Sequence, residues 1–286
     1  MSADAARNWI LTARRQAEIA QAIYLGESFV RSLAESSGAV GVRMFQANHI
    51  QAAALIYDSH VHLVVCGSND EYDWFANSNS RIRYVAKEKV IEGHKGFVDS
   101  ASWLCREILG TGFRPALNGK KMYLGGHSAG GAIAEILPLF DDRLSPAEVF
   151  TFGSPKWCVT DSVPLYLAQG WKTHRFVMSY DPVPYLPLTL WRMMLMQRYF
   201  AHTSTGIEVA DSGELRLCSR VSQAKRFAVI SRAAMGIAGR GVVTYAKAAV
   251  LGALNRVPLV PAHDSARYFE AINQSAVRGT GYLEGE

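Results

Sequence analysis

The sequence lacks any apolar run of about 18 residues, so it predicts no transmembrane helix. Residues 1–35 also lack the continuous apolar stretch of a signal peptide, and we expect a cytoplasmic protein or one exported without a cleavable signal peptide. Its four cysteines show no CxxC spacing, which predicts neither a metal site nor a disulfide framework. With 49% hydrophobic and 19% charged residues, the composition excludes disordered, collagen-like and coiled-coil chains.

No tract rich in Pro, Gly and Ser divides the chain, so residues 1–286 are expected to form a single domain. Apolar residues at three- and four-residue spacing predict helix over residues 1–35, within an N-terminal helical segment that ends near residue 37. Two apolar runs, 52–57 and 60–66, predict a β-hairpin. We expect 67–93 to be mostly loop and a helix to follow over 96–109.

Strands and helices then alternate along the chain. Strands are predicted over 121–124, 148–152 and 174–180, with helices over 129–140 and 163–169 between them. This order is typical of an α/β fold with parallel strands and right-handed crossovers. Because such sheets bind ligands at the carboxyl ends of their strands, catalytic side chains are expected directly after each strand.

The strongest local signal is the sequence GHSAGG at residues 126–131. It lies between a predicted strand and a predicted helix, the position in which G-x-S-x-G carries a nucleophilic serine on a sharp turn. Glycines on both sides of Ser128 allow strained backbone angles and close packing of the turn. An incidental serine in a glycine-rich turn is the alternative.

A serine nucleophile needs a base, and the base needs an orienting acid, in the chain order Ser, acid, His for this fold. Asp181 directly follows a predicted strand, whereas its rival Asp161 is expected to cap the helix over 163–169. Of the eight histidines, only His202 and His263 follow Asp181. We choose His263 because it lies in a loop before a helical run over 266–272. His202 and His127 are expected to support the site without acting as the base.

The developing oxyanion needs two donors. One is expected from the backbone N–H of Ala129, the residue after the nucleophile. The other is expected from Ser68, in the loop after the strand over 60–66. An ordinary polar turn at Ser68 is the alternative.

Several segments together resemble the class 3 (fungal-type) lipases, over roughly residues 50–270. The GHSAGG segment is similar to the family's GHSLGG, and His263 with residues 268–269 is similar to its last H-x-x-YF segment. The other similar segments are 67–68 with 73–74 (oxyanion loop), 93–97 (H-x-GF), 151–156 (TFG-x-PR), 181–187 (D-x-VP-x-LP) and 199–202 (Y-x-H). Two features depart from the family pattern: Cys66 replaces an arginine, and one extra residue separates His263 from Tyr268.

The resemblance implies an α/β-hydrolase fold and hydrolysis of lipid esters, with triacylglycerols or related lipids as substrates. It implies Ser128, Asp181 and His263 as the catalytic triad, an acyl-enzyme intermediate, and no metal or organic cofactor. A phospholipase and an esterase for small soluble esters stay open as alternatives. So does a lipase-like interaction protein without catalysis, although the apparently complete triad argues against it.

Residues 186–260 form an insertion between the acid and the base, and we expect it to be a helical cap or lid. From residue 215 to residue 263 the chain has no Asp or Glu, and Arg232, Arg240 and Lys247 fall on one face of a predicted helix. Such a helix fits an anionic membrane or lipid interface. A helix packed on the sheet with a solvated basic face is the alternative. No nucleic-acid partner is expected, because the basic residues lack a recognition motif.

Overall fold

The computed structural model describes most of the chain, namely residues 2–47, 50–67, 82–85, 90–113, 119–178, 181, 183–187, 198–218 and 263–278. Within these residues an eight-stranded sheet runs through the middle of the molecule, with strand order β1-β2-β3-β6-β7-β9-β11-β12. Its strands are β1 (Gly41–Ala47), β2 (Ile50–Ile56), β3 (His60–Cys66), β6 (Lys121–His127), β7 (Glu148–Phe152), β9 (Lys172–Met178), β11 (Gly206–Val209) and β12 (Leu215–Leu217).

The centre of the sheet is parallel and its borders are antiparallel. Strands β3, β6, β7, β9 and β11 pair in parallel, and for β6, β7 and β9 the alternation of strands and helices predicts this. Strands β2 and β3 form the predicted antiparallel hairpin, with Ile56 opposite Val61. The α/β-hydrolase architecture expected from the sequence is confirmed, since a mostly parallel sheet is flanked by helices.

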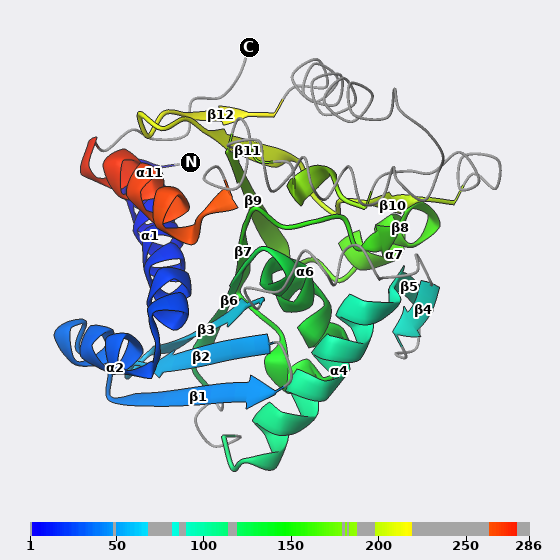
Figure 1. Cartoon of the computed structure of the whole chain (residues 1–286), viewed down its shortest axis with the longest axis horizontal. Helices are drawn as coiled ribbons and strands as arrows, with labels where there is room; N and C mark the ends of the chain where they lie inside the picture. Colours follow the sequence, from blue (N-terminus) through cyan, green and yellow to red (C-terminus); the bar gives the residue numbers. More distant parts are fainter. Residues whose placement is uncertain are drawn as a thin grey trace, which may run out of the picture.

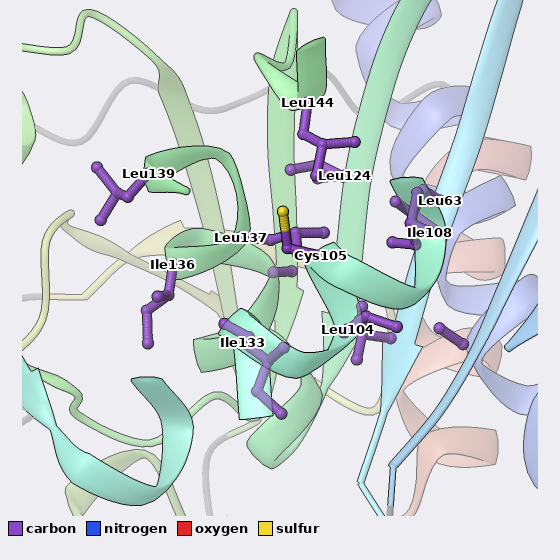
Figure 2. Close-up of a cluster of buried hydrophobic side chains, with 14 of the residues drawn as sticks. Leu63, Leu104, Cys105, Ile108, Leu124, Ile133, Ile136, Leu137, Leu139 and Leu144 are labelled. Atoms are coloured by element: carbon purple, nitrogen blue, oxygen red, sulfur yellow. The ribbon is translucent and has the colours of Figure 1, made fainter. Parts of the chain in front are cut away.

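Helices cover both faces of the sheet (Figure 1). On one face lie α4 (Lys95–Gly110) and α6 (Ala129–Ile136), and on the other lie α1 (Ala3–Leu25) and α11 (Ser265–Arg278). Figure 2 shows Leu104 and Ile108 of α4 with Ile133 of α6 in the core on the first face, together with Leu63 of β3. No helix within the described ranges combines the length and apolar character needed to cross a membrane.

The N-terminal segment is two helices where the periodicity predicts one. Helix α1 ends at Leu25, and α2 (Glu27–Ser36) follows after Gly26. Gly26 has φ of 112°, a backbone conformation that interrupts a helix and that glycine adopts without a steric penalty. The helical periodicity continues through this position, which is why the sequence alone does not reveal the break.

A second sheet corrects two expectations. Its strand order is β10-β8-β5-β4, and its strands are β4 (Ile82–Val85), β5 (Ile91–His94), β8 (Cys158–Val159) and β10 (Phe200–Ala201). Residues 67–93, expected to be mostly loop, therefore contain β4 and most of β5. The insertion 186–260 is expected to be helical, but its residues 198–218 contain the strands β10, β11 and β12. Residues 188–197 and 219–262 lie outside the described residues.

Shorter elements refine the predicted helices. The helix expected over 129–140 ends at Ile136 and continues as the 3-10 turn η1 (Leu137–Leu139), and α7 covers Val163–Leu167. Asp161 was expected to cap α7, but the residue at the N-cap position is Ser162. The other 3-10 turns are η2 (Asp142–Leu144), η3 (Thr160–Ser162) and η4 (Val183–Tyr185).

Two buried histidines should make the fold sensitive to acid. Burial lowers the pKa of His62 from 6.5 to about 3 and that of His94 to about 4, so both are neutral in the folded protein. In the unfolded chain they take up protons as the pH falls below their ordinary pKa. The contribution of these two neutral histidines to the unfolding free energy is therefore present above about pH 6.5. It is lost progressively as the pH falls towards 4 for His94 and towards 3 for His62.

We expect His62 to account for about 2 kcal/mol of the unfolding free energy lost between about pH 7 and pH 5. Urea unfolding of the wild type and of His62→Asn at both pH values measures this contribution. The variant should lose less unfolding free energy than the wild type between the two pH values. Part of the loss remains in the variant because His94 is still present. An equal loss in both proteins would contradict the role of His62.

Candidate active site

Ser128 lies on the sharp turn between β6 and α6. Its φ is 56° and its ψ is −132°, and among the described residues it is the only non-glycine with a positive φ. The turn is also tightly packed: a Cβ added to Gly126 would lie 2.2 Å from the carbonyl oxygen of Gly130, and one added to Gly130 would lie 2.1 Å from that of Val65. The flanking glycines are therefore required to hold the serine in this strained position.

The structure brings Ser128, His263 and Asp181 into one hydrogen-bonded chain. The Nε2 atom of His263 lies 2.6 Å from Ser128 Oγ, and its Nδ1 atom lies 2.8 Å from Asp181 Oδ2. Since a carboxylate only accepts, Nδ1 carries the proton and Nε2 is left to accept the serine hydroxyl. All three side chains are buried. This arrangement can remove a proton from Ser128 and stabilise the charge that then forms on His263.

Asp181 is held by more than the histidine. Its Oδ2 atom accepts a 2.6 Å hydrogen bond from the Tyr268 hydroxyl, and its Oδ1 atom accepts a 2.9 Å bond from the backbone N–H of Val183. Tyr268 in turn accepts from the N–H of Met178, at the end of β9. Burial and the neighbouring Asp181 raise the pKa of Tyr268 well above its ordinary value, so its hydroxyl stays a donor. Three donors thus converge on one carboxylate.

Gly153 makes room for the acid and the base. It directly follows β7 and has φ of 62°. A Cβ at this position would lie 2.7 Å from Asp181 Oδ2 and 2.8 Å from His263 Cε1, both closer than real Cβ contacts. Glycine is therefore required at position 153, because any larger residue would place its Cβ against the Asp181–His263 pair.

The oxyanion site is described in part. Ala129 is the first residue of α6, where backbone N–H groups have no partner within the helix and the positive end of the helix dipole favours an anion. Ser68, the second expected donor, lies outside the described residues. The same is true of Arg232, Arg240 and Lys247, the expected lipid-surface residues.

The rival acid lies away from the site. The side chain of Asp161 is 68% exposed and lies 3.7 Å from Arg198 Nε. Another histidine near a carboxylate, His174, pairs with Glu148. Within the described ranges, no three His, Cys, Asp or Glu side chains are placed to hold a metal ion.

The family model described as Lipase (class 3) matches residues 62–191. This range includes the turn at Ser128 and also Asp181. Over this range the chain is similar to the class 3 lipases.

Solved structures of fungal lipases share the fold of this chain. The native lipase–propeptide complex of Rhizomucor miehei matches with a TM-score of 0.53 and 20% identity, over 74% of this chain and 72% of that chain. The lipase of Rhizopus microsporus var. chinensis matches with a TM-score of 0.54 and 18% identity, over 74% and 78%. A variant of MDLA from Penicillium cyclopium matches with a TM-score of 0.54 and 19% identity, over 76% and 85%. A comparison with curated proteins gives no match.

His127 and His202, the two histidines expected to support the site, contact backbone atoms close to Ser128, His263 and Asp181. His127 Nε2 donates to the carbonyl oxygen of His263 at 2.7 Å. His202 Nε2 donates to the carbonyl oxygen of Pro184 at 2.6 Å, in the turn after Asp181. Burial lowers the pKa of each histidine well below its ordinary value, so both are neutral.

Sequence reasoning missed the roles of Tyr268 and Gly153. Both lie in segments that resemble the family, but only the folded chain brings them to the carboxylate of Asp181. The resemblance of residues 151–156 to a family segment does not indicate that Gly153 faces His263. The hydrogen bond from Tyr268 joins residues 87 positions apart, and no local pattern predicts such a contact.

Proposed function

We propose that this protein is a lipid ester hydrolase that works through an acyl-enzyme intermediate formed on Ser128. The observation that carries the proposal is the chain of hydrogen bonds from Ser128 Oγ through His263 to Asp181, on a lipase fold. Such a chain supplies the base that a serine hydroxyl needs to become a nucleophile.

In the first half-reaction, Ser128 Oγ attacks the ester carbonyl carbon while His263 Nε2 takes the hydroxyl proton. The carbonyl electron pair moves onto oxygen, where the N–H of Ala129 donates to it and Ser68 supplies the second donor. The intermediate then collapses, and the alcohol leaves with the proton held by His263. In the second half-reaction, water attacks the acyl-serine, again giving its proton to His263. The acid is released and Ser128 regains its proton.

The substrate class is tested with nitrophenyl esters of increasing acyl chain length, using Ser128→Ala as the blank. A lipid ester hydrolase should turn over long-chain esters, and its rate should rise when the substrate passes from dissolved monomers to an interface. A preference for short soluble esters without this rise would favour a small-ester esterase. Absence of turnover above the blank on every ester would contradict the catalytic proposal.

The head group is tested separately with triacylglycerol and phospholipid emulsions of matched acyl chains. We propose triacylglycerols or related neutral lipids as substrates, because the matched fungal proteins are described as lipases. Release of fatty acid chiefly from phospholipid would instead assign the protein as a phospholipase.

We also propose that the basic insertion contacts an anionic lipid surface. Its support is the stretch from residue 215 to residue 263, which contains eight Lys and Arg residues and no Asp or Glu. Neutralising Arg232, Arg240 and Lys247 together should weaken binding to vesicles that contain phosphatidylserine by roughly a hundredfold, at about 1 kcal/mol for each charge. Turnover of a soluble ester should stay unchanged. Equal vesicle binding by the wild type and the triple variant would contradict the proposal.

A further inference from the structure

A second hydrogen-bonded chain reaches the base from the N-terminal helix. The Tyr24 hydroxyl, near the end of α1, lies 3.0 Å from His127 Nδ1, and His127 Nε2 lies 2.7 Å from the carbonyl oxygen of His263. The chain therefore links α1 to the backbone of the residue that carries the catalytic imidazole.

The direction of each bond follows from donor and acceptor chemistry. A carbonyl oxygen can only accept, so His127 Nε2 must carry a proton. His127 is neutral, because burial and the neighbouring His263 hold its pKa well below the ordinary value. Its Nδ1 atom is then an acceptor, and Tyr24 is the donor. In both bonds the donor lies on the side of α1 and the acceptor on the side of His263.

The row of hydrogen bonds from Tyr24 through His127 also ends close to the imidazole of His263. The rings of His127 and His263 lie 4.7 Å apart at an interplanar angle of 33°. His263 is thus held at its ring by Asp181 and at its carbonyl by His127. Loss of the Nε2–H tautomer of His127 would turn a lone pair towards the His263 carbonyl and push the base away from Ser128.

On the basis of the proposed triad, we propose that Tyr24 is a positioning residue, which locks His127 in the Nε2–H tautomer and so fixes the backbone of His263. Through this residue, helix α1 sets the geometry of the catalytic base. In this role Tyr24 acts through its hydrogen bond to His127.

The test is a double-mutant cycle between Tyr24→Phe and His127→Asn, with kcat and KM measured on a soluble nitrophenyl ester. Removing one hydrogen bond should lower kcat about threefold to tenfold in Tyr24→Phe, with KM changed less than about twofold. In His127→Asn, whose short amide cannot reach the His263 carbonyl, adding Tyr24→Phe should cause no further loss.

Two further variants separate positioning from general destabilisation. His127→Gln, whose longer amide can still donate to the His263 carbonyl, should keep more activity than His127→Asn. Tyr57→Phe removes a comparable hydroxyl, which lies 2.8 Å from Ser37 Oγ at the opposite end of the sheet, and should leave kcat unchanged. Active-site titration with a phosphonate corrects all rates for the fraction of folded enzyme.

The outcomes also distinguish this proposal from that of the triad. Equal kcat in the wild type and Tyr24→Phe, or the same loss in the His127→Asn background, would overturn the role of Tyr24 while leaving Ser128 as nucleophile. A wild-type enzyme in which the phosphonate does not label Ser128 would overturn both.

Discussion

Replacing Asp181 with asparagine is expected to lower kcat roughly ten-thousandfold, because His263 would be held in the wrong tautomer. The carboxylate accepts from three donors: His263 Nδ1–H, the Tyr268 hydroxyl and the Val183 N–H. An amide has one oxygen. If that oxygen accepts from Val183, the NH2 group faces His263 and forces Nδ1 to accept, so Nε2 carries the proton and cannot take one from Ser128.

The opposite orientation of the amide does not rescue the site, since its NH2 group would then face the N–H of Val183. The matched control is Asp161→Asn, at an exposed position away from the triad, and it should leave kcat unchanged. The rates are compared on the same soluble ester after correction for folded protein. A large loss in Asp161→Asn with a mild effect in Asp181→Asn would reverse the assignment of the acid.

Replacing Gly153 with alanine should lower kcat about a hundredfold. The added Cβ would lie 2.7 Å from Asp181 Oδ2 and 2.8 Å from His263 Cε1, so at least one of these side chains must move. A displacement of about 1 Å in a catalytic group costs on the order of a hundredfold in rate. The positive φ of 62° adds a backbone strain of about 1–2 kcal/mol.

Gly170→Ala separates the two effects. Gly170 has φ of 77°, so alanine meets a similar backbone strain, but an added Cβ would find nothing within 4 Å. Both variants should unfold at lower temperature by differential scanning calorimetry, and only Gly153→Ala should lose kcat. Similar kcat losses in the two variants would show that strain, and not displacement of the triad, controls the rate.

The parts of the site that local pattern predicts are those that follow directly from strand ends. Ser128 follows β6 and Asp181 follows shortly after β9, and parallel strands bring their carboxyl ends to one edge of the sheet. His263 lies before α11, in the loop where the sequence predicts a base. The three side chains are therefore brought together by a topology that the alternation of strands and helices already indicates.

The supporting contacts lie beyond such reasoning because they join elements that are far apart in the chain. Tyr24 and His127 are separated by 103 positions, and the helical pattern around Tyr24 explains only its place on α1. The second sheet was missed for another reason. Its strands have two to four residues each, too short for a period-two pattern to stand out from a loop.

The described part of the insertion contains strands that the sequence analysis did not predict. The amphipathic helix expected around Arg232, Arg240 and Lys247 lies outside the described residues, whereas β11 and β12 extend the central sheet beside β9. A tight turn at Gly213, with φ of 81°, joins this pair. An alanine Cβ there would lie 2.8 Å from the backbone nitrogen of Ser275, so the turn packs directly against α11.

The most direct test of the triad is to locate the adduct of a fluorophosphonate by peptide mass spectrometry, in the wild type and in His263→Ala. The wild type should carry one adduct, on the peptide that contains Ser128, and His263→Ala should be labelled far more slowly because the serine has lost its base. An adduct on another residue, or labelling of Ser128 at the same rate without His263, would contradict a nucleophile activated through His263 and Asp181.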